Sequence, residues 1–76
     1  MTLHQLGQKL NEMYFGADDG ETAAMVHLFG IKYATEITAL GASMKSIAIA
    51  AGIPESYGTE ISKGVKLEKY VTLKQT

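Results

Sequence analysis

The sequence contains no cysteine, no arginine and no long apolar run. Without cysteine, neither a disulfide framework nor a thiolate zinc site can stabilise the chain. No apolar segment approaches the roughly 20 residues that a membrane-spanning helix needs. The amino end shows no charged segment followed by an apolar core, so no export signal is predicted. We therefore expect a cytoplasmic location and no membrane partner.

Charged residues are few, and the two signs are unevenly distributed. A net charge of −1 is not typical of proteins that hold nucleic acid by bulk electrostatics. Residues 1–42 have two lysines and five carboxylates, a balance of −3, whereas residues 43–76 have five lysines and three glutamates, a balance of +2. Because a bidentate arginine on guanine is the commonest specific base contact, the absence of arginine leaves lysine, serine, threonine and tyrosine to read any bases.

The length bounds the architecture. A chain of 76 residues with 46% hydrophobic residues predicts one globular domain, residues 1–76. This is near the lower end of the sizes that fold without a disulfide or a metal. Stability must therefore come from packing, and a second copy of the chain is a further source of it.

Apolar residues at helical spacing predict helices in the first half of the chain. Thr2 begins a capping box, so a helix should start at Leu3 and end at Gly16. The segment Glu21–Leu40 is almost continuously apolar, which predicts a central helix covered on several sides. Gly30 lies in its middle and either permits close approach of a neighbouring helix or breaks this one. We favour a single helix with a bend.

Residues 43–64 predict two helices joined by a tight turn, and no other segment suggests a function as specific. Ser43 can cap a first helix over Met44–Ala51, because a serine hydroxyl accepts a bond from a free N–H of the first turn. Gly52 follows the last apolar position, where helices commonly end in a left-handed residue.

The second helix of the pair is predicted to start at Pro54, whose fixed φ suits a first helical position. It should continue from Glu55 to Lys63, with Gly64 as its end. Apolar residues recur every four positions and should face inward together: Ile53, Tyr57 and Ile61.

This pair resembles the helix-turn-helix of bacterial DNA-binding proteins over about a quarter of the chain. That family has a small residue inside the first helix and a glycine in the turn, and Ala48 and Gly52 stand at those places. Apolar residues flank the turn at matching positions: Ile47, Ile53 and Ile61. Gly58 stands where the family usually has a branched aliphatic residue, and Pro54 replaces a common serine or threonine. The whole chain is also similar to small bacterial proteins described as HTH-like.

The resemblance implies that the first helix braces the second across the DNA backbone, while the second lies in the major groove. Glu60 could accept from a cytosine amino group, but a carboxylate near phosphates more often opposes binding. For Tyr57, inward packing is favoured over a contact with DNA. We expect Ser56, Thr59, Glu60 and Lys63 in the groove and Lys45 and Lys66 on phosphates, with Tyr57 and Ser62 as further candidate nucleic-acid-binding residues.

The carboxyl end predicts a different element. After Gly64, β-branched and aromatic residues alternate partially, and Tyr70 to Leu73 predict a short strand. A lone strand is not stable in water, so the same strand of a second copy is its expected partner. Such pairing would make the protein a homodimer. The alternative is an unpaired tail.

No catalytic, metal or cofactor site is predicted. His4 and His27 lie on different predicted helices, and neither has a second ligand at a suitable spacing. The serines have no nucleophile-elbow context, and no glycine pattern matches a phosphate-binding loop. We therefore expect neither an enzyme nor a small-molecule substrate.

Together these features predict an all-α domain, a compact bundle of about four helices with a C-terminal helix-turn-helix and a short terminal β-strand. The predicted function is that of a small DNA-binding protein, acting as a homodimer in transcriptional or mobile-element control. The alternative is a non-enzymatic protein-interaction or dimerisation module that uses the helix pair as scaffold and does not bind DNA.

Overall fold

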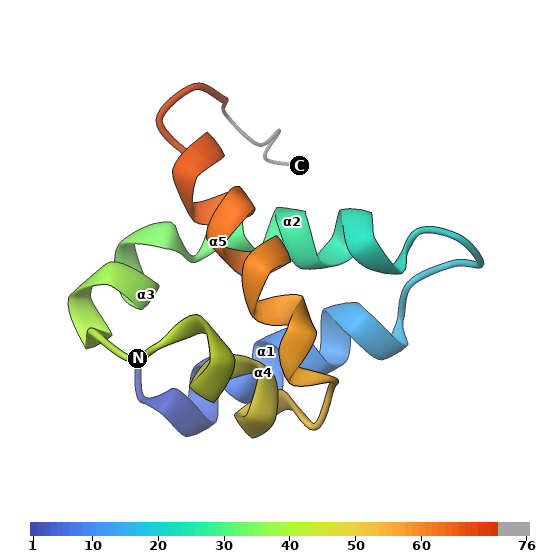
Figure 1. The fold of residues 1–76 in the computed structure, drawn as a ribbon, viewed down its shortest axis with the longest axis horizontal. Helices are drawn as coiled ribbons and strands as arrows, with labels where there is room; N and C mark the ends of the chain where they lie inside the picture. Colours follow the sequence, from blue (N-terminus) through green and yellow to red (C-terminus); the bar gives the residue numbers. More distant parts are fainter. Residues whose placement is uncertain (72–76) are drawn as a thin grey trace.

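The computed structural model describes residues 1–71, which form a helical bundle without a strand. The elements are α1 (Leu3–Phe15), α2 (Thr22–Lys32), α3 (Ala34–Leu40), α4 (Met44–Ala51), a 3₁₀ turn η1 (Glu55–Tyr57) and α5 (Gly58–Leu67). Helix α5 packs mainly on α2, and α1 packs mainly on α4 (Figure 1). Within the described part of the chain, no helix has both the length and the apolar character that crossing a bilayer requires.

The first helix has the predicted bounds. The Thr2 hydroxyl accepts from the Gln5 N–H at 3.1 Å, and the Thr2 N–H donates to Gln5 Oε1 at 2.9 Å. These two bonds complete the capping box, and Gly16 follows the last helical residue. The prediction for this helix is therefore confirmed.

The single helix predicted over Glu21–Leu40 is wrong, because the segment forms α2 and α3. The break lies at Tyr33, where φ is −109° and ψ is 19°, and not at Gly30. The turn directs Ala34 and Ile37 into the core, where they are 5% and 1% exposed. A single straight helix could not bury the apolar residues of both α2 and α3 in the same core.

Gly30 has the other role considered for it, since it lies at a close crossing of α2 and α5. A Cβ atom on Gly30 would lie 2.5 Å from the carbonyl oxygen of Ile61 and 2.9 Å from the Cα atom of Gly64. Gly64 was predicted to end its helix, but it is buried within α5, which continues to Leu67. A Cβ atom there would collide with the carbonyl oxygen of His27.

Two further crossings are also close. A Cβ atom on Gly7 of α1 would lie 2.8 Å from the backbone of Ala50 in α4. A Cβ atom on Gly58 would lie 3.2 Å from the backbone nitrogen of Lys45 and 3.3 Å from the carbonyl carbon of Met44. Gly58, which departs from the helix-turn-helix pattern, thus lets the start of α5 approach the start of α4.

The core receives side chains from all five α-helices of residues 1–71 and from the turn after α4. Ile53 and Ile61 are 6% and 0% exposed, and Tyr57 is half-buried against the core, so the inward stripe is confirmed. The buried apolar cluster comprises Leu6, Leu10, Val26, Phe29, Ile37, Ile47, Ala48, Ala51, Ile53 and Ile61.

The predicted terminal strand is not supported, since the described residues contain no strand. Val65 and Leu67 belong to α5. Tyr70 lies in a turn, and its backbone N–H donates to the Leu67 carbonyl at 2.9 Å. The partial alternation of apolar residues after Gly64 therefore belongs to a helix in which Val65 packs inward and Leu67 is exposed, and not to an extended segment. Thr72 and Leu73 lie outside the described residues.

We predict that Gly64→Ala destabilises the fold. Alanine favours a helix by about 1 kcal/mol relative to glycine. The added methyl group would nevertheless meet the backbone of His27, and overpacking of this kind costs about 1–3 kcal/mol or more. Urea denaturation should therefore show a lower free energy of unfolding.

The matched control is Lys66→Ala, an exposed position of the same helix. Its free energy of unfolding should stay within about 0.5 kcal/mol of the native value. A Gly64→Ala variant as stable as the native chain would show that the crossing is not close.

Candidate nucleic-acid interface

Helix α4 ends at Gly52 in the predicted left-handed conformation, within a Schellman motif. Gly52 has φ of 74°, and its N–H donates to the Ile49 carbonyl at 3.0 Å. The Ile53 N–H donates to the Ala48 carbonyl at 3.2 Å. This 6→1 and 5→2 pair of bonds satisfies the last carbonyls of the helix. Because the Ile53 side chain is buried directly after it, the turn is anchored to the core.

Both ends of α4 have a side-chain hydrogen bond. The Ser43 hydroxyl accepts from the Ser46 N–H at 3.1 Å, which confirms the predicted cap. At the other end, Asn11 Nδ2 of α1 donates to the Ala51 carbonyl at 2.8 Å. The first bond is local to α4, whereas the second joins the end of α4 to α1. The Asn11 bond joins residues 40 positions apart, and no local sequence pattern indicates it.

The second helix of the motif starts later than predicted. Pro54 is extended, with φ of −56° and ψ of 134°, and the Tyr57 N–H donates to its carbonyl at 3.0 Å to form η1. Helix α5 begins only at Gly58, where the chain meets the backbone of α4. Ser56 therefore lies in the 3₁₀ turn and not within the second helix.

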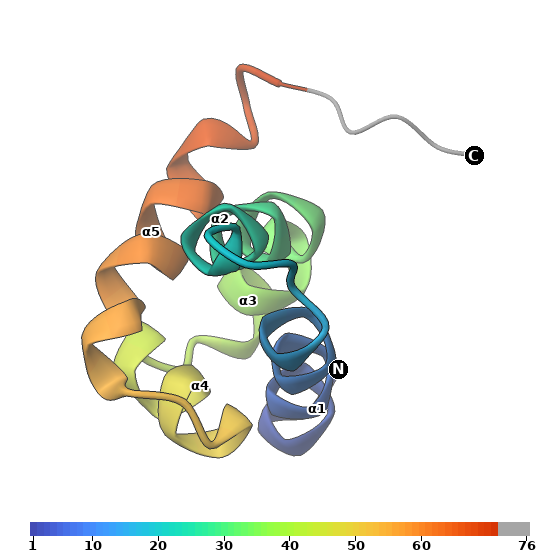
Figure 2. The same ribbon diagram turned by 90° about the vertical axis from the view of Figure 1, so that its right-hand side faces the viewer.

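One side of α5 faces away from the bundle. The buried residues of α5 are Gly58, Ile61 and Gly64, and they lie on the opposite side of the helix. Thr59, Lys63 and Lys66 are exposed and recur at the i, i+4, i+7 spacing of one helical face, with half-buried Ser62 beside them. Figure 2 shows α5 along one edge of the molecule, with α2 and α3 on its inner side. We call Thr59, Ser62, Lys63 and Lys66 the outer face of α5.

The lysines on and near this face form only weak ion pairs. Lys63 Nζ lies 3.4 Å from Glu60 Oε1, and Lys45 Nζ lies 3.6 Å from Glu55 Oε1. The side chains of Lys63 and Lys45 are 63% and 65% exposed. Exposed pairs of this kind contribute about 0–1 kcal/mol, so an anionic partner can displace them. Lys66 is exposed on the same face.

The hydroxyl groups differ in their availability. Thr59 Oγ1 donates to the Ser56 carbonyl at 2.9 Å, so its oxygen is free to accept while its proton is used locally. Ser56 is exposed beside it, and Ser62 is half-buried at the edge of the outer face of α5. A phosphate oxygen, which only accepts, would have to replace the Thr59 bond.

Glu60 does not lie on the outer face. Its side chain is 25% exposed, and its Oε2 atom is hydrogen-bonded to Nε2 of His27 on α2. This hydrogen bond is the main reason why the pKa of Glu60 is lowered; burial opposes the shift and Lys63 adds to it. The sequence analysis found no partner for His27, because Glu60 lies 33 residues further along the chain.

Tyr57 packs inward. Its ring meets that of Tyr14 edge-on, with centroids 5.3 Å apart, and Tyr14 meets Phe15 in the same manner at 4.9 Å. Burial raises the pKa of Tyr14, and its interaction with the Tyr57 side chain raises it further. The geometry therefore favours packing over a contact with DNA for Tyr57.

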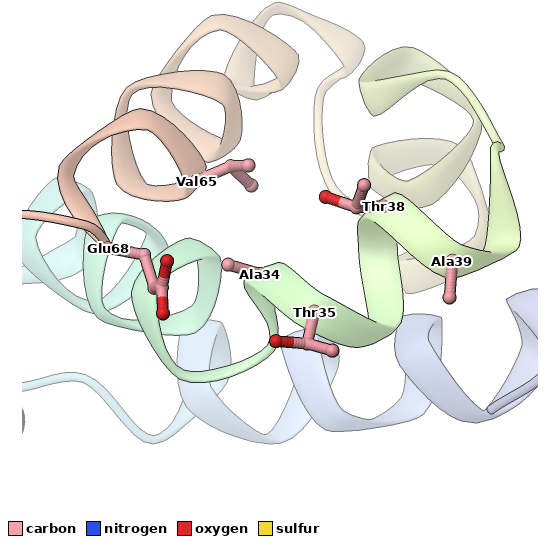
Figure 3. Close-up of a pocket in the computed structure, with 6 residues that line it drawn as sticks. All are labelled: Ala34, Thr35, Thr38, Ala39, Val65 and Glu68. Atoms are coloured by element: carbon pink, nitrogen blue, oxygen red, sulfur yellow. The ribbon is translucent and has the colours of Figure 1, made fainter.

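A separate hollow of about 410 Å³ lies between α3 and α5. In Figure 3, Val65 of α5 and Thr38 of α3 both point into the space between these helices. The hollow contains one carboxylate, that of Glu68, and no nucleophile paired with a base. In residues 1–71, no three histidine, aspartate or glutamate side chains converge to hold a metal ion. The lining residues are Ala34, Thr35, Thr38, Ala39, Val65 and Glu68.

Comparison with known proteins agrees with the helix pair. Residues 2–74 match the family model described as HTH-like domain. The chain belongs to the HTH-like domain family. No curated protein and no solved structure matches it. A helix-turn-helix-like domain is thus established, and this type of domain suggests nucleic-acid binding in general.

We predict that Glu60→Gln lowers the melting temperature at neutral pH. The pKa of Glu60 is lower in the folded chain than its ordinary value of 4.5, so its carboxylate stabilises the fold above that pH. This stabilisation is lost as the pH falls through the lowered pKa. Thermal unfolding of the native and variant chains should therefore differ at pH about 7 and converge at strongly acidic pH.

Glu55→Gln serves as the control, since within residues 1–71 the exposed Glu55 is paired only with an exposed lysine. It should change the melting temperature little at either pH. A difference between native chain and Glu60→Gln that does not depend on pH would contradict the assignment.

Proposed function

We propose that this member of the HTH-like domain family binds double-stranded DNA with the outer face of α5 in the major groove. The observation that carries the proposal is the alignment of Thr59, Lys63 and Lys66 on the exposed side of α5. Glu60, the one carboxylate within α5, is turned towards α2. The second motif helix thus presents hydroxyl and ammonium groups to a partner.

The proposed contacts differ in kind. Lys63 and Lys66 bind phosphates or base acceptors, and Lys45, at the start of α4, binds a phosphate on the flank. Ser56 and Ser62 supply further hydroxyl groups at the margins. Without arginine, the surface has no bidentate fork for guanine, so most of the affinity would come from electrostatics and sequence preference would be modest.

We further propose a cytoplasmic homodimer that acts in transcriptional or mobile-element control. Helix-turn-helix dimers place two second helices about 34 Å apart, one turn of DNA. In support, large apolar side chains are exposed at the end of α5, where Leu67, Tyr70 and Val71 are 43%, 74% and 43% exposed. A second copy could cover them without any strand pairing.

Changing Thr59 and Lys63 together to alanine should lower DNA affinity about tenfold or more, since each contact of this kind is worth about 1–3 kcal/mol. Fluorescence anisotropy with a mixed pool of duplexes measures the affinity, and circular dichroism verifies that the fold is retained. Lys9→Ala on α1 removes the same charge from another helix and should bind normally. Unchanged affinity of the double variant would refute the proposed surface.

The salt dependence separates this proposal from the alternative, a protein-interaction module that does not bind DNA. The net charge of −1 and the hollow between α3 and α5 favour that alternative. For DNA binding, affinity should fall steeply with salt, and Lys66→Ala should reduce the logarithmic slope by about 1. Absence of DNA binding at low salt, with salt-insensitive self-association by mass measurement, would favour the interaction module.

A further inference from the structure

The contact between His27 and Glu60 joins the two helices that cross most closely. The carbonyl oxygen of His27 lies against the backbone of Gly64, so the His27 backbone is packed directly on α5. From this fixed position, Nε2 of His27 is hydrogen-bonded to Oε2 of Glu60. The other carboxylate oxygen, Oε1, lies 3.4 Å from Nζ of Lys63. Glu60 is thus shared between α2 and a lysine of the outer face.

We infer that His27 is a positioning residue for DNA binding, which holds the Glu60 carboxylate towards α2 and leaves Lys63 available for phosphate. This inference rests on the proposed function. The side chain of Lys63 is 63% exposed while that of Glu60 is 25% exposed, so the cation extends further into solvent than the anion does. The arrangement holds one carboxylate oxygen of Glu60 at α2, so that only the other oxygen is left to pair with Lys63, three residues further along the same helix.

Without His27, Lys63 is the only remaining side-chain partner of Glu60 within the described residues. The carboxylate would then turn to Lys63, engage its ammonium group more fully and bring a negative charge closer to the outer face. Both effects weaken attraction to phosphates, because a like charge opposes the approaching anion and a paired lysine attracts it less. The lowered pKa of Glu60, due mainly to the hydrogen bond from His27, agrees with a carboxylate held in its charged form.

The test is a double-mutant cycle on DNA affinity at low salt, with a fluorescently labelled mixed-sequence duplex as the probe. The full chain is compared with His27→Ala, Glu60→Gln and the variant that combines both. His27→Ala should weaken binding about three- to tenfold, the size of one displaced charge near the surface. In the Glu60→Gln background the same change should alter affinity less than about twofold, because the carboxylate it releases is absent.

Two further variants sharpen the comparison. His27→Gln retains an N–H donor and should bind within about twofold of the native chain. His4→Ala removes the other histidine, which is exposed on α1, and should bind as the native chain does. Melting temperatures of all variants ensure that affinities are measured on folded protein. A merely structural role for His27 would not be relieved by Glu60→Gln.

The outcomes are distinguishable. If the native chain binds DNA and His27→Ala has no effect, or weakens binding equally with and without Glu60, the inference is overturned while the proposed function stands. If the native chain does not bind the duplex even at low salt, the proposed function fails and the inference fails with it. A loss of affinity on His27→Ala that disappears in the Glu60→Gln background supports both.

Discussion

The close crossing of α2 and α5 at Gly30 and Gly64 determines which side of α5 reaches solvent. No side chain separates the two backbones there, so rotation of α5 about its axis would place a bulkier residue against α2. The crossing buries Ile61 and brings Glu60 to His27. The opposite side of the helix is then left to polar residues and lysines. A helix packed less closely would not present one defined face to a partner.

Much of the fold follows from local chemistry that the sequence displays. The capping box at Thr2, the serine cap at Ser43 and the left-handed Gly52 each determine a helix end, and all are present as predicted. What failed was the interpretation of glycine within apolar segments. Gly64 can end a helix or permit a crossing, and only the position of α2 decides between these. The break at Tyr33 likewise depends on burying Ile37, which is a tertiary constraint.

The exposed side of the second helix could be predicted from the sequence, because the helical period alone places Thr59, Lys63 and Lys66 on one side of it. The inward side of Tyr57 was also anticipated. The direction of Glu60 was not, since it depends on His27, which lies on another helix and 33 residues away. Sequence spacing gives the angle of a residue around its own helix. It does not reveal which residue of another helix will form a hydrogen bond with a side chain at the edge of the exposed face.

The most direct measurement is an NMR titration of the ¹⁵N-labelled chain with a short mixed-sequence DNA duplex at low salt, following each backbone amide. If the outer face of α5 binds DNA, the largest shifts will fall on Thr59, Ser62, Lys63 and Lys66, with smaller ones near Lys45, and the amides of α1 will be unaffected. Shifts confined to α1 or to the hollow between α3 and α5, or no shifts at all, would contradict the assignment of α5 as the DNA-binding helix.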